Sequence, residues 1–186
     1  MVGTASRIRI TLGVIAMLFV LGLLACDSAV ASSQDPCRNA MPTSLARELH
    51  HRFPEWRHLT LRDLDGYEEL FMRDHKNKCP GIAKADFFAD ARPVYAVVLF
   101  RGQEEVTNGF LLMARRVDNR RWEITELMRD ACPCPVVAAP MGQYRNVYGE
   151  KTIESKGEVF IHFQYEAWAI VFAWTGKAIE QTHIRD

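Results

Sequence analysis

A basic start followed by an apolar run separates the beginning of this chain from the part that can fold. Residues 1–10 carry Arg7 and Arg9 and no acid, and residues 10–25 are apolar apart from Thr11 and two glycines. This order is typical of a secretion signal peptide. As a helix, residues 10–25 rise about 24 Å, less than the roughly 30 Å hydrocarbon core of a bilayer. We therefore expect export, with an uncleaved anchor as the less favoured alternative.

Two candidate cleavage sites follow the apolar run. Residues 23–26, Leu-Leu-Ala-Cys, resemble the lipobox of bacterial lipoproteins, in which the cysteine, here Cys26, becomes the lipidated first residue. Residues 29–31, Ala-Val-Ala, form a site for the ordinary signal peptidase. We favour the lipoprotein type, with signal 1–25, and the alternative is signal 1–31. The first predicts a protein anchored by lipid on the periplasmic or extracellular side of a membrane, and the second predicts a soluble periplasmic or secreted one.

The remainder has the size and charge of one ordinary domain. Removal of residues 1–25 takes away two arginines and no acid, which leaves 21 basic against 23 acidic residues. Such a balance gives no strong positive field, so we expect no nucleic-acid partner. We interpret residues 26–41, which are short, polar and contain prolines, as a tether, and residues 42–186 as a single globular domain.

The cysteine count supports export. Five cysteines would leave one unpaired in an oxidising compartment. Cleavage at either site leaves Cys26 unavailable for a disulfide, because the residue is either lipidated or removed with the signal peptide. The other four are an even set, which predicts two disulfides: Cys37, Cys79, Cys132 and Cys134.

The local sequence reduces the number of plausible pairings among these four cysteines. Cys132 and Cys134 each precede a proline, which favours extended backbone. Side chains two residues apart in an extended chain have Cα atoms about 6.5–7 Å apart, at or beyond the comfortable limit for a disulfide. We therefore expect each of them to bond to one of Cys37 and Cys79, although a turn at Cys-Pro would reverse this.

Apolar spacing predicts two helices before residue 80. Thr43 or Ser44 can cap a helix that buries Leu45 and Leu49 and stops before Pro54. Asp65 and Glu68 have the spacing of a capping arrangement for a second helix, whose inward residues would be Tyr67, Leu70 and Phe71.

After residue 81 the pattern changes to the two-residue period of strands. Residues 94–100 are apolar on both faces, which is typical of a central strand, and residues 110–117 and 121–127 flank a turn at Asp118. Residues 132–143 contain three prolines and predict an irregular loop, while alternation returns in 159–165, 168–174 and 178–184. The predicted fold class is α+β, with two N-terminal helices packed on a mostly antiparallel β-sheet meander.

Residues 84–99 resemble the D-F-N-G-D-G-x-x-D-Y-A-V motif of FG-GAP and VCBS-like repeats, whose acidic residues coordinate calcium. Asp86 and Asp90 match, but the asparagine, both glycines and the third aspartate are replaced, by Phe88, Ala89, Ala91 and Val94. Two carboxylates are too few for the six to eight oxygens that calcium takes, so the segment from Asp86 to Leu99 predicts a turn into a strand and no metal. Together with the exported cysteine pattern and the Trp-rich C-terminal hairpin, it resembles an uncharacterised family of small bacterial exported proteins or lipoproteins.

No complete catalytic motif is present. We interpret the two cysteines of Cys132-Pro133-Cys134-Pro135 as members of structural disulfides. The alternatives are a redox pair and a soft-metal site. The sequence contains none of the common nucleophile, zinc-protease, P-loop or dinucleotide motifs, so the catalytic residues stay unknown and no cofactor is expected. Six histidines are available as bases or ligands: His50, His51, His58, His75, His162 and His183.

These observations favour a binding or accessory domain over an enzyme. We expect an envelope-localised, lipid-anchored, non-enzymatic domain with a protein or glycan partner. One alternative is a small periplasmic enzyme whose histidine and carboxylate, such as His162 and Glu166, meet only in the fold. The other is a redox or metal-binding protein that uses Cys132 and Cys134. A deep pocket with paired titratable groups would favour the enzyme.

Overall fold

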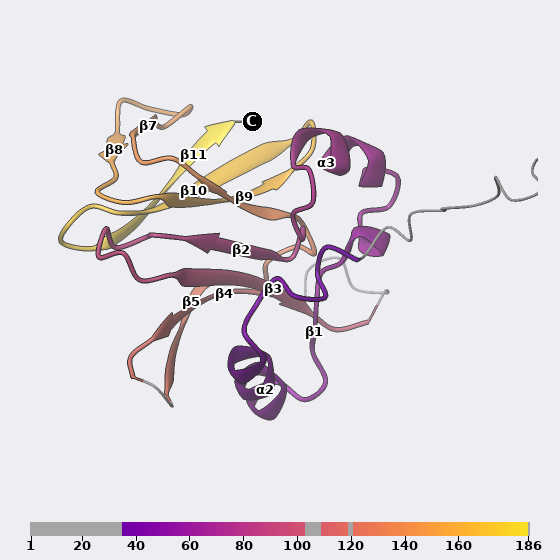
Figure 1. Cartoon of the computed structure of the whole chain (residues 1–186). Helices are drawn as coiled ribbons and strands as arrows, with labels where there is room; N and C mark the ends of the chain where they lie inside the picture. The colour runs from indigo at the N-terminus through magenta and orange to yellow at the C-terminus, as the bar shows by residue number, and fades with distance from the viewer. Residues whose placement is uncertain (1–34, 103–108, 119–120, 186) are drawn as a thin grey trace, which may run out of the picture. The chain divides into compact units, whose positions relative to one another are not determined.

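The computed structural model describes residues 35–102, 109–118 and 121–185, and Figure 1 shows how their strands stack. The predicted signal, Cys26 and residues 26–34 of the predicted tether lie outside the described residues. None of the described helices is long and apolar enough to cross a membrane. The elements in chain order are α2 (Thr43–Arg52), β1 (Arg57–His58), the 3-10 turn η1 (Leu61–Asp63), α3 (Glu68–Asp74), β2 (Ile82–Ala85), β3 (Val94–Phe100), β4 (Gly109–Arg116), β5 (Trp122–Arg129), β6 (Val136–Ala139), β7 (Gln143–Arg145), β8 (Thr152–Glu154), β9 (Val159–Gln164), β10 (Trp168–Trp174) and β11 (Ile179–Arg185).

Two antiparallel sheets make up most of the described chain. The first has the strand order β1-β3-β4-β5, with β2 also paired to β3, and the second has the order β11-β10-β9-β6. Strands β7 and β8 form a separate two-stranded sheet. Side chains of both larger sheets share one hydrophobic cluster, in which Val98 and Phe100 of β3 join Phe160 of β9 and Phe172 of β10. The main core therefore lies between the sheets (Figure 1).

The predicted α+β class, with two N-terminal helices on a single meander, is wrong: the protein is mainly antiparallel β. Both predicted helices occur, but they are short, at ten residues for α2 and seven for α3. Helix α2 fully buries only Leu45 and Leu49, and α3 only Phe71. The meander also breaks after β5, because β6 pairs with β9 of the second sheet.

Strand β3 confirms the prediction of a central strand. All seven of its residues are buried. One face contributes to the core between the sheets, and the other, including Val97 and Leu99, packs with Leu45 and Leu49 of α2. The predicted hairpin partners are also confirmed as β4 and β5, which pair with each other.

Local details of the helix ends differ from the sequence predictions. Pro42, and not Thr43 or Ser44, stands at the N-terminal end of α2, and no side chain caps the helix. The capping box forms at η1, between Thr60 and Asp63, whereas Asp65 takes a left-handed φ of 43°. The irregular loop predicted over residues 132–143 contains strand β6.

The disulfide pairing is the second correction. Cys37 bonds to Cys79, and Cys132 bonds to Cys134, so the predicted cross-pairing is wrong. The reason is a tight turn, in which the Cys134 amide donates a 2.7 Å hydrogen bond to the Cys132 carbonyl. This turn brings the two Cα atoms to 5.2 Å, inside the range for a disulfide.

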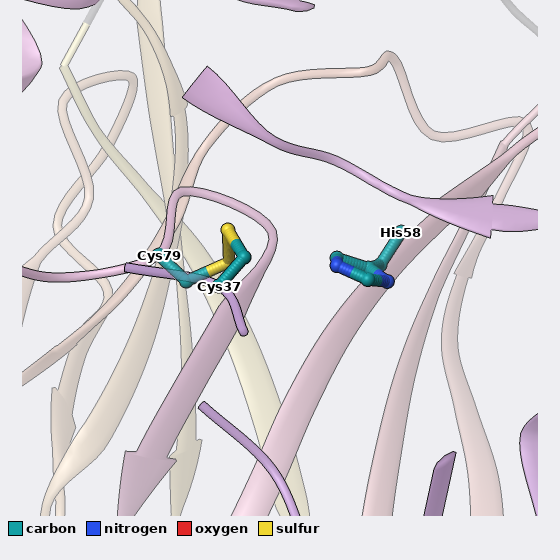
Figure 2. Close-up of side chains that lie close together, drawn as sticks. All are labelled: Cys37, His58 and Cys79. Carbon is teal, nitrogen blue, oxygen red and sulfur yellow. A yellow bond between two sulfur atoms is a disulfide. The ribbon is translucent and has the colours of Figure 1, made fainter. Parts of the chain in front are cut away.

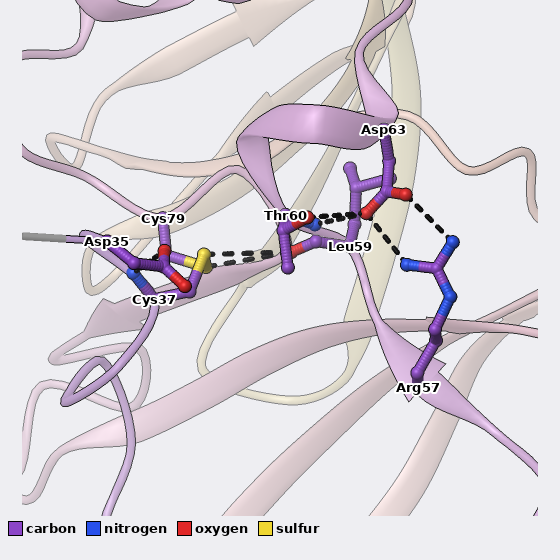
Figure 3. The surroundings of a disulfide bond; sticks show 7 residues. All are labelled: Asp35, Cys37, Arg57, Leu59, Thr60, Asp63 and Cys79. Atoms are coloured by element: carbon purple, nitrogen blue, oxygen red, sulfur yellow. Dashed lines mark hydrogen bonds and ion pairs between the residues drawn. A yellow bond between two sulfur atoms is a disulfide. The ribbon is translucent and has the colours of Figure 1, made fainter.

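The Cys37–Cys79 bridge fastens the start of the described chain to the segment that leads into β2. Both cysteines are buried, and the Leu59 carbonyl oxygen lies 3.8 Å from Cys37 Sγ and 3.7 Å from Cys79 Sγ (Figure 3). Bridged sulfurs carry no hydrogen, so these are packing contacts. Nearby, Asp63 accepts two hydrogen bonds from the Arg57 guanidinium and closes the η1 turn (Figure 3).

The two bridges should differ in their effect on stability. The chain-entropy model gives about 4 kcal/mol for a separation of 42 residues and roughly 1.6 kcal/mol for a separation of two. We therefore expect the double variant Cys37→Ala, Cys79→Ala to lose more than twice the free energy of unfolding lost by Cys132→Ala, Cys134→Ala. Urea unfolding of both variants measures this. Equal losses would contradict the pairing and its assigned role.

Candidate functional site

A cavity of about 430 Å³ lies beside α2 and β1, next to Cys37. Its polar lining comes from side chains that can donate or accept hydrogen bonds: Arg38, Asn39, Thr43, His50 and His58. Its apolar lining includes Met41, Leu49, Trp56 and Leu99. None of the residues that line it is acidic. The lining combines apolar and polar side chains, which is the usual composition of a small-molecule pocket.

Three short segments place these groups. The turn after Asp35, in which Arg38 N–H donates to the Asp35 carbonyl, presents Arg38 and Asn39. On α2, Thr43 and His50 are seven residues apart, which puts them on the same face two turns from each other. His58 comes from β1, which pairs with Leu99 of β3 in the first sheet. The cavity therefore rests on a disulfide-bonded turn, a helix and a sheet edge.

Arg38 is the lining cation that stays available to a ligand. Arg57 also lines the cavity, but its guanidinium is held by Asp63 at 2.8 and 2.9 Å and lies 4.1 Å from the Phe100 ring centroid. Burial lowers the pKa of His58, with Asp35 opposing the shift, so His58 is mostly neutral at neutral pH. Within the described residues, Arg38 makes no ion pair. The cavity is thus suited to an anionic group.

His58 also lies close to the Cys37–Cys79 bridge, as Figure 2 shows. One ring nitrogen of His58 and the two sulfurs lie within 4.8 Å of one another. Soft metals bind thiolates and neutral imidazole, but sulfurs joined in a disulfide are not thiolates. The cluster could therefore bind a metal only in a reduced protein, and with the bridge closed Cys37 and His58 line the cavity.

A second group of reactive side chains gathers at the Cys132–Cys134 bridge. Cys132 is partly exposed and Cys134 is almost buried. His162 of β9 is fully buried, and its Nε2 lies 3.8 Å from Cys132 Sγ. The Trp168 ring packs edge-on against His162, with centroids 5.2 Å apart.

The protonation of His162 follows from its contacts. Its Nδ1 lies 3.1 Å from the Pro135 carbonyl oxygen, which can only accept, so Nδ1 carries the hydrogen. Burial lowers the pKa of His162 from 6.5 to about 4, so the ring is neutral at neutral pH. Nε2 therefore presents an unprotonated nitrogen to Cys132 Sγ.

The predicted pair of His162 and Glu166 receives no support. Glu166 is exposed in the turn after β9, with a left-handed φ of 59°. Neither a hydrogen bond nor an ion pair joins the two side chains in the described part of the chain, and the pKa of His162 responds only to burial and to the Pro135 carbonyl.

The remaining histidines are dispersed. His50 and His51 are exposed on α2, and of these two only His50 lines the cavity. His75 packs against Phe71 and Phe163, and burial lowers its pKa. His183 lies against Tyr148, with ring centroids 5.5 Å apart.

The acidic segment before β3 is a closed turn. Asp86 Oδ1 accepts hydrogen bonds from the amides of Asp90 and Ala91, and Asp90 forms a 2.6 Å ion pair with Arg115. Ala89 and Ala91 have φ values of 55° and 60°, the left-handed region that glycine favours. Both carboxylates are thus engaged by donors of the protein itself.

Comparisons with family models, with curated proteins and with solved structures found no match for this chain. The resemblances to FG-GAP repeats and to exported proteins therefore stay predictions.

Sequence reasoning missed both groupings for the same reason. Arg38 and His58 are twenty residues apart, and Cys132 and His162 are thirty residues apart, so only the fold brings each set together. One signal in the sequence points to the second group, because His162 interrupts the apolar residues of a predicted strand.

The burial of His162 should make the free energy of unfolding depend on pH. An unfolded histidine binds a proton near pH 6.5, whereas folded His162 does so near pH 4, so stability is complete above pH 6.5 and falls as the pH drops toward 4. The loss is about 3 kcal/mol. We expect His162→Asn, whose amide can still donate to the Pro135 carbonyl, to lose that much less stability than the parent between pH 7 and pH 4.

Urea unfolding at pH 7, 5.5 and 4 measures this difference, with the exposed His51→Asn as the matched control. A His162→Asn variant with the same pH dependence as the parent would contradict the buried, neutral assignment.

Proposed function

We propose that this chain is an exported binding domain, held at a membrane by lipid on Cys26, and that its cavity beside α2 binds an acidic saccharide. The observation that carries the ligand class is the lining, which has an available guanidinium and no carboxylate. A glycan is one of the partners that the sequence predicts. The N-terminal signal, the lipobox and the two disulfides support the location.

The size and chemistry of the cavity suit a sugar that carries a carboxylate. Its volume of about 430 Å³ lies within the 300–1,000 Å³ range typical of ligand pockets. Asn39, Thr43 and His50 can exchange hydrogen bonds with hydroxyl groups, and Met41 and Leu49 offer apolar surface to ring C–H groups. Arg38 then supplies a charged, fork-shaped donor for the carboxylate.

Binding is favoured over catalysis at this cavity. Within the described residues no hydrogen bond joins His58 or His50 to a carboxylate that would orient it as a base. Burial acts to raise the pKa of Asp63, but hydrogen bonds from Arg57 and Thr60 engage its carboxylate and lower the pKa overall. The Asp35 carboxylate acts on His58 through its charge and accepts a hydrogen bond from Cys37 N–H. The side chains that line the cavity are therefore better suited to bind a ligand than to catalyse a reaction.

A titration with D-glucuronate, with D-glucose as the uncharged match, tests this proposal. We expect amide NMR shifts around Arg38 and His58 with glucuronate and much smaller ones with glucose. Arg38→Gln should weaken glucuronate binding roughly ten-fold or more, because a hydrogen bond to a charged group is lost. Added salt should weaken it as well.

The control is Arg47→Gln, which removes an exposed arginine of α2 that does not line the cavity. Equal shifts with both sugars, or equal losses in the two arginine variants, would contradict the assignment of the cavity to an acidic sugar.

The anchor has its own test, by mass spectrometry of the mature protein. We expect a chain that begins at Cys26 and carries acyl groups, and a Cys26→Ser variant that lacks them and leaves the membrane fraction. An unlipidated parent chain that begins at Ser32 would refute the lipid anchor and favour the alternative cleavage after Ala31.

A further inference from the structure

The two disulfides occupy different environments, and only one is placed for exchange. Cys37 and Cys79 are 5% and 3% exposed and tie together segments 42 residues apart. Cys132 and Cys134 are separated by one residue, and Cys132 is partly exposed. Cys132 is the one of these four cysteines that is not buried, so we expect a thiol in solution to reach the Cys132–Cys134 bridge before the other bridge.

Hydrogen bonds around the Cys132–Cys134 bridge can hold the local structure when the bridge opens. The Cys134 amide donates a hydrogen bond to the Cys132 carbonyl. The Pro135 carbonyl accepts hydrogen bonds from Phe163 N and His162 Nδ1. None of these hydrogen bonds involves the sulfurs. The strand that follows, β6, remains paired with β9 from Val136 to Ala139.

His162 provides a partner for the reduced state. While the bridge is closed, Cys132 Sγ has no hydrogen, and Nε2 has nothing to accept from it. On reduction, the Cys132 thiol gains a hydrogen that it can donate to Nε2, 3.8 Å away, which is within reach for a sulfur donor. The causes that shift the pKa of this ring include no charged side chain of the described residues. The ring also packs against Trp168 and donates to the Pro135 carbonyl.

We propose that Cys132 and Cys134 form a thiol–disulfide exchange site, in which the Cys132–Cys134 bridge oxidises a partner dithiol, Cys132 is the sulfur attacked, and His162 is the positioning residue for the reduced form. This site is separate from the cavity and independent of the proposed saccharide binding.

The exchange is balanced in two steps. A thiolate of the partner dithiol attacks Cys132 Sγ, a mixed disulfide forms, and the Cys132–Cys134 bond breaks with its electron pair on Cys134 Sγ. The second partner thiolate then attacks the partner sulfur of the mixed disulfide and expels Cys132 as a thiolate. The two protons lost by the partner thiols end on Cys134 and Cys132. The partner leaves as a disulfide, and the protein holds two thiols.

The first test treats the native, full-length protein with graded mixtures of reduced and oxidised glutathione, followed by alkylation and peptide mass spectrometry. We expect labelling of Cys132 and Cys134 while Cys37 and Cys79 stay protected, which makes the second bridge an internal control. The proposal is overturned if both bridges open together, or if the Cys132–Cys134 bridge opens only when the protein unfolds.

The second test identifies the attacked sulfur with a matched pair of variants. With oxidised glutathione, Cys134→Ser should gain a glutathione adduct on Cys132, whereas Cys132→Ser should gain none on Cys134 until it unfolds. The reverse pattern would overturn the assignment of Cys132.

The third test addresses His162 through the redox equilibrium. His162→Asn can keep the hydrogen bond to Pro135 but removes Nε2, so the ratio of reduced to oxidised pair at fixed glutathione should fall roughly five-fold. His162→Gln, whose amide oxygen can take the place of Nε2, should restore part of it. An unchanged ratio in His162→Asn, with circular dichroism matching the parent, would overturn the role of His162.

Discussion

Burial of β3 on both faces is the constraint on which the rest of the structure depends. All seven side chains from Val94 to Phe100 are removed from water, so the strand needs a covering layer on each side. One layer is the second sheet, and the other includes α2, through Leu45 and Leu49. The cavity beside α2 and the His162 site on β9 therefore belong to opposite layers of the same core.

The two disulfides act at different levels of this arrangement. Cys37–Cys79 is buried and fixes the turn that carries Arg38 to the strands, and its contribution lies in packing and in the restriction of the unfolded chain. Cys132–Cys134 spans a single residue and adds little restriction, but it places the sulfur of a partly exposed cysteine beside an unprotonated histidine nitrogen. The first bridge supports the cavity that we propose to bind a ligand, and the second is the site that we propose for thiol–disulfide exchange.

The positions of strands could be predicted from the sequence better than the pairing of strands or of cysteines. The apolar run at Val94–Phe100 predicts a central strand because burial on both faces leaves a direct trace in the sequence, and the β4–β5 hairpin follows from local alternation. The pairing of β6 with β9 leaves no such trace, and the prolines before Val136 suggested a loop. The disulfide pairing failed for a related reason, because one hydrogen bond between Cys134 N and the Cys132 carbonyl replaced the extended geometry that the prolines favour. The lining of the cavity depends on the same long-range contacts.

The central claim is that the cavity between α2 and β1 recognises a carboxylate-bearing sugar through Arg38. The most direct measurement is a crystal structure of the protein soaked with D-glucuronate. We predict electron density for the sugar in the cavity, with its carboxylate within hydrogen-bonding distance of the Arg38 guanidinium and its ring against Met41 and Leu49. An empty cavity at saturating glucuronate, or a sugar whose carboxylate faces away from Arg38, would contradict the account.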